Sequence, residues 1–195
     1  MGLSKYLDYK TTIHYSVNMS GHSKWSQIKH QKGATDAKKS QMFSKLARMI
    51  GVAARRGENP DMNSELRMAI EKAKSINMPL DNIERAIKKG GGKTEGAQLE
   101  SVRYEAYGPG GSAIIIEAIT DSKNTTFAEL KHLFSLRNAK LGEPGSVLWA
   151  FENKNGKFEP KTTLELSETD AQLLDILLGA LDDHDDVQEV YTNAL

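Results

Sequence analysis

Hydrophobic residues in the first half of the chain recur with a helical period. They predict helices over residues 35–56, 64–77 and 79–89, with Asn63 capping the second and Gly57 and Gly90 ending the first and third. Three short amphipathic helices with brief connections are typical of a small helical bundle. The apolar side contains Met42, Phe43, Leu46, Ala47, Ile50, Ala53 and Ala54 in the first helix, Leu66, Ile70, Ala73 and Ile76 in the second, and Leu80, Ile83 and Ile87 in the third.

The second half changes to alternating and β-branched patterns. Strands are predicted over 102–107 and 112–120 on either side of the turn "GPGG", over 146–151, along an extended stretch at 157–166, and over 187–192. Helices are predicted over 125–138, with Phe127, Leu130, Leu133 and Phe134 inward, and over 167–183. From Ser112 on, the order is strand, helix, strand, strand, helix, strand. We therefore predict an α+β protein, a three-helix bundle followed by a ferredoxin-like, split βαβ domain.

These changes of pattern divide the chain into four segments. Residues 1–18 show no clear period and are predicted to be a poorly ordered extension. Residues 19–93 hold a basic arm and the helical bundle, residues 94–100 are a linker, and residues 101–195 form the α+β domain.

The charge is balanced overall and unevenly distributed. The 26 Lys and Arg residues equal the 26 Asp and Glu residues, yet residues 20–93 hold 16 basic against 7 acidic residues and residues 94–195 hold 8 against 18. Such a split suggests a basic binding module joined to an acidic one. The alternative is that the two halves attract each other and neutralise their charges at a shared face.

The basic residues of the first half are arranged in a pattern. On a helical projection of residues 35–56, five basic residues fall within an arc of about 100° opposite the apolar side: Lys38, Lys45, Arg48, Arg55 and Arg56. Lys39 lies toward the apolar side. The preceding stretch "GHSKWSQIKHQKGATDAKK" (21–39) places lysines around an indole and two imidazoles. Ammonium groups neutralise phosphates and aromatic rings stack on exposed bases, so nucleic acid is the predicted partner. The candidate residues are His22, Lys24, Trp25, Lys29, His30, Lys32, Lys38, Lys39, Lys45, Arg48, Arg55 and Arg56.

Other chemistry finds little support. The chain has no cysteine, and "GGGKT" has Ile87 where a phosphate loop needs its first glycine. His22 and His30 are eight residues apart, and "DDHDD" (182–186) is predicted to be a solvated acidic loop rather than a divalent-metal site. No arrangement of serine, histidine and acid indicates a nucleophile. We predict no enzyme activity, metal, cofactor or small-molecule substrate.

Hydropathy gives no sign of a membrane segment. No apolar run approaches the roughly 20 residues that a membrane helix needs. Residues 1–18 lack the apolar centre of a signal peptide. The sequence therefore predicts a cytoplasmic protein without a membrane partner, and leaves its oligomeric state open.

Several motifs together resemble the YebC family, which includes PmpR-type regulators and the mitochondrial translational activator of cytochrome c oxidase. The resemblance extends from 19 to 194. It is carried by "MSGHSKWSQIKHQKGATDAKKSQMFSKLARMI", "AARRG", "NPDMNSELRMAIEKAKSINMPLDNIERAIKKG", "YEAYGPGGSAIIIEAITDSKN", "GSVLWAF" and "DDVQEVYTN".

The resemblance implies a non-enzymatic regulator of gene expression that binds nucleic acid. An RNA-binding, ribosome-associated translation factor is favoured over a DNA-binding transcriptional regulator, because the first helix offers phosphate-gripping cations and a single amide, Gln41, for reading base edges. A protein-interaction module that binds no nucleic acid is a further alternative. The matched positions carried over are Lys24, Lys29, Lys32, Lys38, Lys39, Lys45 and Arg48.

This sequence departs from the family pattern in three places. Residues 1–18 are extra, and the loop "DSKNTT" has Lys123 alone where the family is rich in arginine. Family members resemble three-domain proteins, whereas here "ENKNGKFEPKTTLEL" connects "SVLWAF" directly to the last helix. We therefore expect a short form that lacks the third domain.

Overall fold

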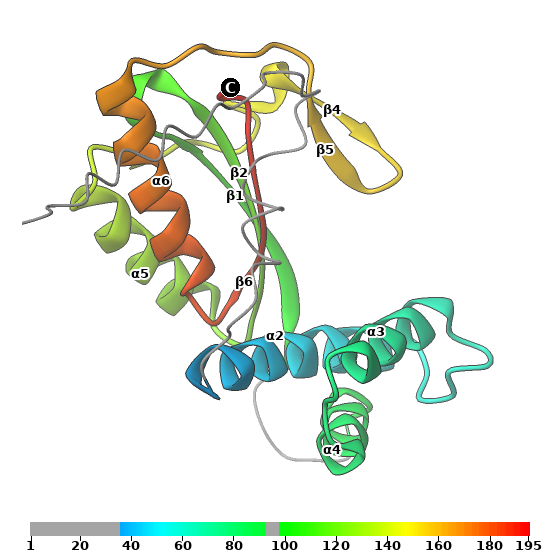
Figure 1. Ribbon diagram of the computed structural model, residues 1–195. Coiled ribbons are helices and arrows are strands. Elements are labelled where there is room, and N and C mark those ends of the chain that lie inside the picture. Colours follow the sequence, from blue (N-terminus) through cyan, green and yellow to red (C-terminus); the bar gives the residue numbers. More distant parts are fainter. Residues whose placement is uncertain (1–35, 93–97) are drawn as a thin grey trace, which may run out of the picture.

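The computed structural model describes residues 36–92 and 98–195, so the predicted extension at 1–18 lies outside the described residues. The first described part is a helical unit of three helices: α2 (Asp36–Ala54), α3 (Ser64–Ser75) and α4 (Leu80–Gly90). The second is a sheet unit. Helix α2 lies across one end of that sheet, with α4 on its far side and α3 alongside it (Figure 1).

The three helices of the helical unit pack around one apolar cluster. Ile50, Leu66 and Ile83 are buried at its centre, as the helical period predicted. Asn63 joins two helix ends. Its side-chain oxygen accepts from Leu66 N at 3.1 Å, and its Nδ2 donates to Ala53 O and Gly57 O at 2.8 Å each. The predicted cap thus also satisfies carbonyls at the end of α2.

The sheet unit is built on four antiparallel strands in the order β3-β1-β2-β6. Its strands are β1 (Glu100–Tyr107), β2 (Ala113–Thr120), β3 (Lys140–Leu141) and β6 (Val187–Thr192). Helices α5 (Lys123–Ser135) and α6 (Glu168–Asp182) cover one face (Figure 1). A hairpin of β4 (Phe151–Lys154) and β5 (Lys157–Pro160) lies on the other. The α+β class is therefore confirmed.

Strand β2 is buried on both faces. Ile114 and Ile116 pack among the α5 and α6 side chains, and Ala113 and Ile115 pack beneath the β4–β5 hairpin. A strand covered on both sides needs apolar residues at successive positions, which explains the unbroken run "AIII". Short 3-10 turns occur at Pro109–Gly111, within "GPGG", and at Leu148–Ala150.

Two features of the predicted sheet are wrong. Residues 146–151 do not form a strand, because Leu148–Ala150 is a 3-10 turn and β4 begins at Phe151. The strand order is also not ferredoxin-like. β2 pairs with β1 along one edge and with β6 along the other, so no third strand can join it, and β4 and β5 form a separate two-stranded sheet.

Two apolar residues predicted to face inward are exposed. Leu80, the first residue of α4, is 60% exposed. Phe127 is 47% exposed because Thr126 takes the inward position, in line with Leu130 and Phe134. Thr126 can occupy a buried site because its hydroxyl finds hydrogen-bond partners there.

The connection from β5 to α6 comprises only residues 161–167, which leaves no room for a further domain at this point of the chain. Ser167 caps α6, its side chain accepting from Asp170 N at 3.1 Å. Within the described ranges, none of the helices combines the length and apolarity needed to cross a lipid bilayer.

Candidate nucleic-acid interface

The predicted basic side of α2 is divided between solvent and the sheet unit. Lys38 and Lys39, in its first turn, are exposed. Lys45 and Arg48, further along, reach acidic residues between the end of α6 and the start of β6. The expected continuous cationic face is thus interrupted where α2 crosses the end of the sheet (Figure 1).

Lys45 binds the end of α6. Its Nζ donates to Asp182 O at 2.6 Å and lies 3.3 Å from Asp182 Oδ1, and the residue is only 8% exposed. Gln41 Nε2 donates to the same carbonyl at 3.2 Å. The carbonyls at a helix C-terminus carry partial negative charge, which a buried ammonium group neutralises. Lys45 therefore joins the two units in this structure.

Arg48 binds the turn after α6. Its Nη1 lies 2.9 Å from Asp186 Oδ1 and donates to Ile119 O at 3.4 Å. Asp186 is itself buried, and its Oδ2 accepts from Thr126 Oγ1 at 2.6 Å. The carboxylate thus connects α2, α5 and the turn before β6. Lys45 and Arg48 of the basic half are thus neutralised by Asp182 and Asp186 of the acidic half. At these two residues the structure has the neutralisation between halves that the uneven charge distribution left open as an alternative.

The two arginines after α2 also have protein partners. Arg55 Nη1 donates to Leu99 O at 2.7 Å and Nη2 to Gln98 Oε1 at 3.2 Å, which ties the end of α2 to the approach to β1. Arg56 forms an ion pair with Glu65 at the surface. Both arginines are exposed. The exposed Arg56–Glu65 ion pair contributes little stability.

The remaining candidates, His22, Lys24, Trp25, Lys29, His30 and Lys32, lie outside the described residues. Helix α4 adds cations that sequence analysis did not single out. Arg85 and Lys89 are exposed and line the same depression as residues of α2. The α4 sequence "ERAIKK" could have indicated these cations, because its basic residues alternate with the apolar residues that the helix buries.

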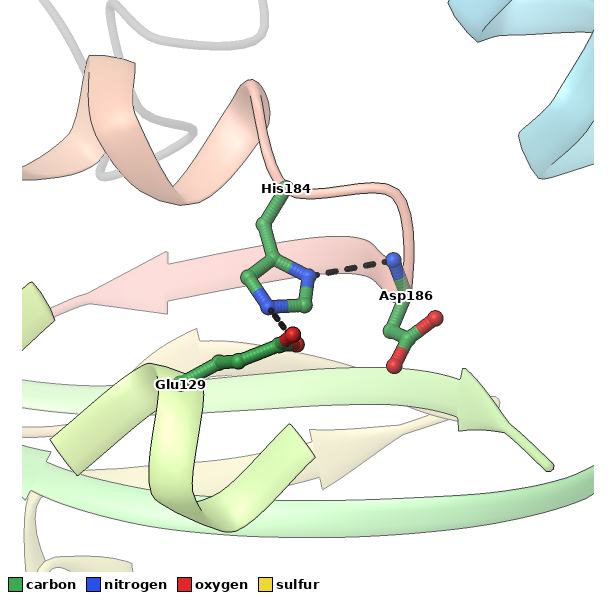
Figure 2. A group of neighbouring side chains, drawn as sticks. All are labelled: Glu129, His184 and Asp186. Carbon is green, nitrogen blue, oxygen red and sulfur yellow. Dashed lines mark hydrogen bonds and ion pairs between the residues drawn. The ribbon is translucent and has the colours of Figure 1, made fainter. Parts of the chain in front are cut away.

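The acidic loop "DDHDD" differs from its prediction as a solvated segment. Asp186 is buried and Asp182 half-buried, while Asp183 and Asp185 are exposed. His184 is held on both ring nitrogens (Figure 2). Its Nε2 lies 3.1 Å from Glu129 Oε2, and its Nδ1 accepts from Asp186 N at 3.1 Å. The loop is therefore ordered by contacts to α5 and within itself.

Glu129, His184 and Asp186 bring potential metal ligands within 4.8 Å of one another. Each already has a protein partner. Both ring nitrogens of His184 and both carboxylate oxygens of Asp186 are hydrogen-bonded or ion-paired. A metal ion here would have to displace Arg48 or Thr126, so the geometry fits a structural cluster better than a metal centre.

Comparison with known families extends over almost the whole chain. The family profile described as "TACO1/YebC protein N-terminal domain" matches residues 23–93. The profile described as "TACO1/YebC second and third domain" matches residues 99–158 and 153–194. These two segments meet at the β4–β5 hairpin.

Individual relatives agree with these profiles. A "Probable transcriptional regulatory protein" of Petrotoga mobilis is 50% identical over 177 residues, covering 89% of this chain and 70% of the relative. One of the same name from Pseudothermotoga lettingae is 41% identical over 236 residues, covering 90% and 93%. That alignment is longer than this 195-residue chain, so the relative has residues with no counterpart here.

A solved structure supports the fold. The crystal structure of a conserved hypothetical protein, Aq1575, from Aquifex aeolicus matches with a TM-score of 0.81 and 35% identity. The match covers 89% of this chain and 97% of that one. The arrangement of helical and sheet units is thus shared with an experimentally determined relative.

Proposed function

This chain belongs to the TACO1/YebC family, and from that premise we propose that it regulates gene expression by binding nucleic acid as a non-enzymatic factor. The relatives from Petrotoga mobilis and Pseudothermotoga lettingae carry the name "Probable transcriptional regulatory protein". The net positive charge of residues 20–93 supports a polyanionic partner. Lys38 and Lys39 of α2 are the described, exposed candidates for phosphate contacts.

Within this function, we favour an RNA-binding factor that acts on the ribosome. The observation that carries this preference is the position of Gln41. It is the single amide side chain of α2, and its Nε2 donates to Asp182 O. Reading duplex DNA requires side chains free to reach base edges in the major groove. With Gln41 directed at the sheet unit, α2 offers cations that bind phosphate without specifying sequence.

A DNA-binding transcriptional regulator is the second candidate, favoured by the names of the relatives. Binding and cosedimentation separate the two. The protein is titrated, across a salt series, with ribosomal RNA and with duplex DNA, and is sedimented with intact ribosomes. Cosedimentation and preference for RNA would support the first candidate. A sequence preference on duplex DNA that survives roughly 200 mM salt, without cosedimentation, would support the second.

Charge reversal tests whether the helical unit is the binding surface. Lys38→Glu/Lys39→Glu changes two exposed cations and leaves the Lys45 and Arg48 contacts intact. Lys157→Glu/Lys161→Glu makes the same charge change on exposed residues of the sheet unit and is the matched control. We expect the first variant to weaken binding at least tenfold and the control to change it little. Equal binding by all three proteins would show that Lys38 and Lys39 are not the binding surface, and no binding by any of them would favour a protein-interaction module.

A further inference from the structure

A groove runs between α2 and α4 and encloses about 480 Å³. This volume lies within the range of pockets that hold small ligands or single chemical groups of larger ones. Basic and polar residues form the rim of the groove, and apolar residues form its floor. The lining includes Phe43, Ala47 and Arg48 of α2 and Arg85, Ala86 and Lys89 of α4.

The position of the groove is fixed by a close contact between two glycines. Gly51 of α2 and Gly90 of α4 meet backbone to backbone, since a Cβ added at Gly90 would collide with Gly51 O and Cα. All the α2 and α4 residues that line the groove precede these glycines. The two helices are therefore pinned together at one end, and the groove lies along them on the other side of that contact.

The rim of the groove is positively charged. Arg48 is already paired with Asp186, but Arg85 and Lys89 have no carboxylate within 4 Å among the described residues. Arg85 is held in place by neutral partners on its own helix, donating to Asp81 O at 3.2 Å and to Asn82 Oδ1. Asp121 is the single acidic side chain of the lining. This arrangement suits an anionic ligand.

The floor of the groove is apolar and includes an aromatic ring. Phe43 is half-buried, packing on the core of the helical unit while also lining the groove. Ala47, Met78, Ala86 and Leu99 complete the apolar surface. A flat ring beside two uncompensated cations matches a nucleotide, in which an aromatic base is joined to a phosphate. A base paired inside a duplex is not accessible to such a floor.

We propose that this groove binds single-stranded nucleic acid, with Arg85 and Lys89 contacting phosphates and a base packed against Phe43. The inference rests on the proposed function and names the site on the helical unit that would hold the strand. It adds α4 to the α2 cations and assigns a single-stranded ligand.

The first test measures binding of the full-length protein to a fluorescein-labelled 12-nucleotide oligouridine by anisotropy, at several salt concentrations. Arg85→Glu/Lys89→Glu reverses the two rim cations. Lys74→Glu/Lys88→Glu makes the same change at exposed positions of α3 and α4 that do not line the groove. We expect at least a tenfold weaker Kd for the rim variant and a salt slope reduced by about 1.4, two contacts at about 0.7 each. The control should change Kd less than threefold.

The second test locates the base. An oligonucleotide carrying 4-thiouridine is photocrosslinked to the wild-type protein, and the modified peptides are identified by mass spectrometry. We expect crosslinks in 40–48 and 82–89. Phe43→Leu keeps an apolar side chain against the core but removes the ring, and should weaken binding about fivefold or more with an unchanged salt slope. The crosslinking result decides the proposal if Phe43→Leu lowers stability.

The outcomes separate this inference from the proposed function. If wild-type protein binds nucleic acid but the rim and control variants weaken it equally, or crosslinks fall outside α2 and α4, the groove is not the site and the function stands. The inference also fails, and the function stands, if an unlabelled 12-base-pair duplex displaces the labelled oligouridine as well as an unlabelled single strand does. If wild-type protein binds neither RNA nor DNA at 50 mM salt, the proposed function itself fails.

Discussion

Arg48 of α2 and Asp186 of the turn before β6 form an ion pair at 2.9 Å across the boundary between the helical and sheet units. The pair is largely shielded from water, because the two side chains are 25% and 12% exposed. Asp186 also accepts from Thr126 at 2.6 Å. One carboxylate therefore links three segments that are far apart in the sequence, and this makes it a sensitive point for stability.

Asp186→Asn should destabilise the protein by about 2 to 4 kcal/mol. The substitution keeps the shape of the side chain but leaves the Arg48 guanidinium without its counter-charge in a partly buried site. Urea unfolding followed by circular dichroism measures the change. Asp185→Asn removes the same charge from the exposed neighbouring residue and should alter the free energy of unfolding by less than about 0.5 kcal/mol. Equal effects of both substitutions would contradict the structural role of Asp186.

The sheet unit should fold without the helical unit. Residues 98–195 contain both apolar clusters of the sheet, one under α5 and α6 and one under the β4–β5 hairpin. We expect this fragment to unfold cooperatively in urea, at a lower midpoint than the whole protein, because Asp182 and Asp186 lose Lys45 and Arg48. A broad, non-cooperative transition would show that the sheet unit depends on α2 for its fold.

The crossing of α2 and α4 depends on the absence of a side chain at Gly90. Gly90→Ala should cost about 1 to 3 kcal/mol, because the new Cβ would meet the backbone of Gly51, which cannot move aside as a side chain could. Gly179→Ala is the matched control. Gly179 lies inside α6 with nothing within 4 Å of an added Cβ, so alanine there should stabilise by about 0.5 to 1 kcal/mol. Thermal unfolding should shift in opposite directions for the two variants.

Local pattern predicted the elements of this fold well where one face of an element meets a core. The apolar period identified α2, α3 and α4, and Asn63 marked the start of α3. The order of the strands was harder to predict from the sequence. Nothing local distinguishes a strand that joins the main sheet from the β4–β5 pair that forms its own, because the difference depends on which edges of β2 are already occupied.

The candidate site shows the same limit. Sequence analysis placed Lys45 and Arg48 on the side of α2 opposite its core, but their partners lie 137 and 138 residues away along the chain. A charge pattern along one helix cannot reveal whether a distant carboxylate covers it. The groove beside α4 likewise arises from the Gly51–Gly90 contact, which only the three-dimensional packing brings about.

Glu117, in the middle of β2, should make stability depend on pH. Burial raises the pKa of its carboxyl group above the ordinary 4.5, and the opposing Arg103 on β1 offsets part of this, while Glu189 on β6 adds to it. Between the ordinary and the raised pKa, the folded protein keeps a proton that the unfolded chain has released. The contribution of Glu117 to stability therefore falls as pH rises from about 4.5 through the raised value.

Glu117→Gln tests this sign directly. Glutamine does not titrate, so the free energy of unfolding of the variant minus that of wild type should increase between pH 4 and pH 7. Arg103 Nη2 lies 3.5 Å from Glu117 Oε1 and attracts only the ionised carboxylate, so its effect is already contained in the net rise of the Glu117 pKa. Urea unfolding at half-unit pH intervals measures the difference, with Glu143→Gln at an exposed site as the control for lost negative charge. A flat difference would show that Arg103 and burial cancel, and a difference that favours wild type increasingly toward pH 7 would show that Arg103 stabilises the carboxylate more strongly than burial disfavours it.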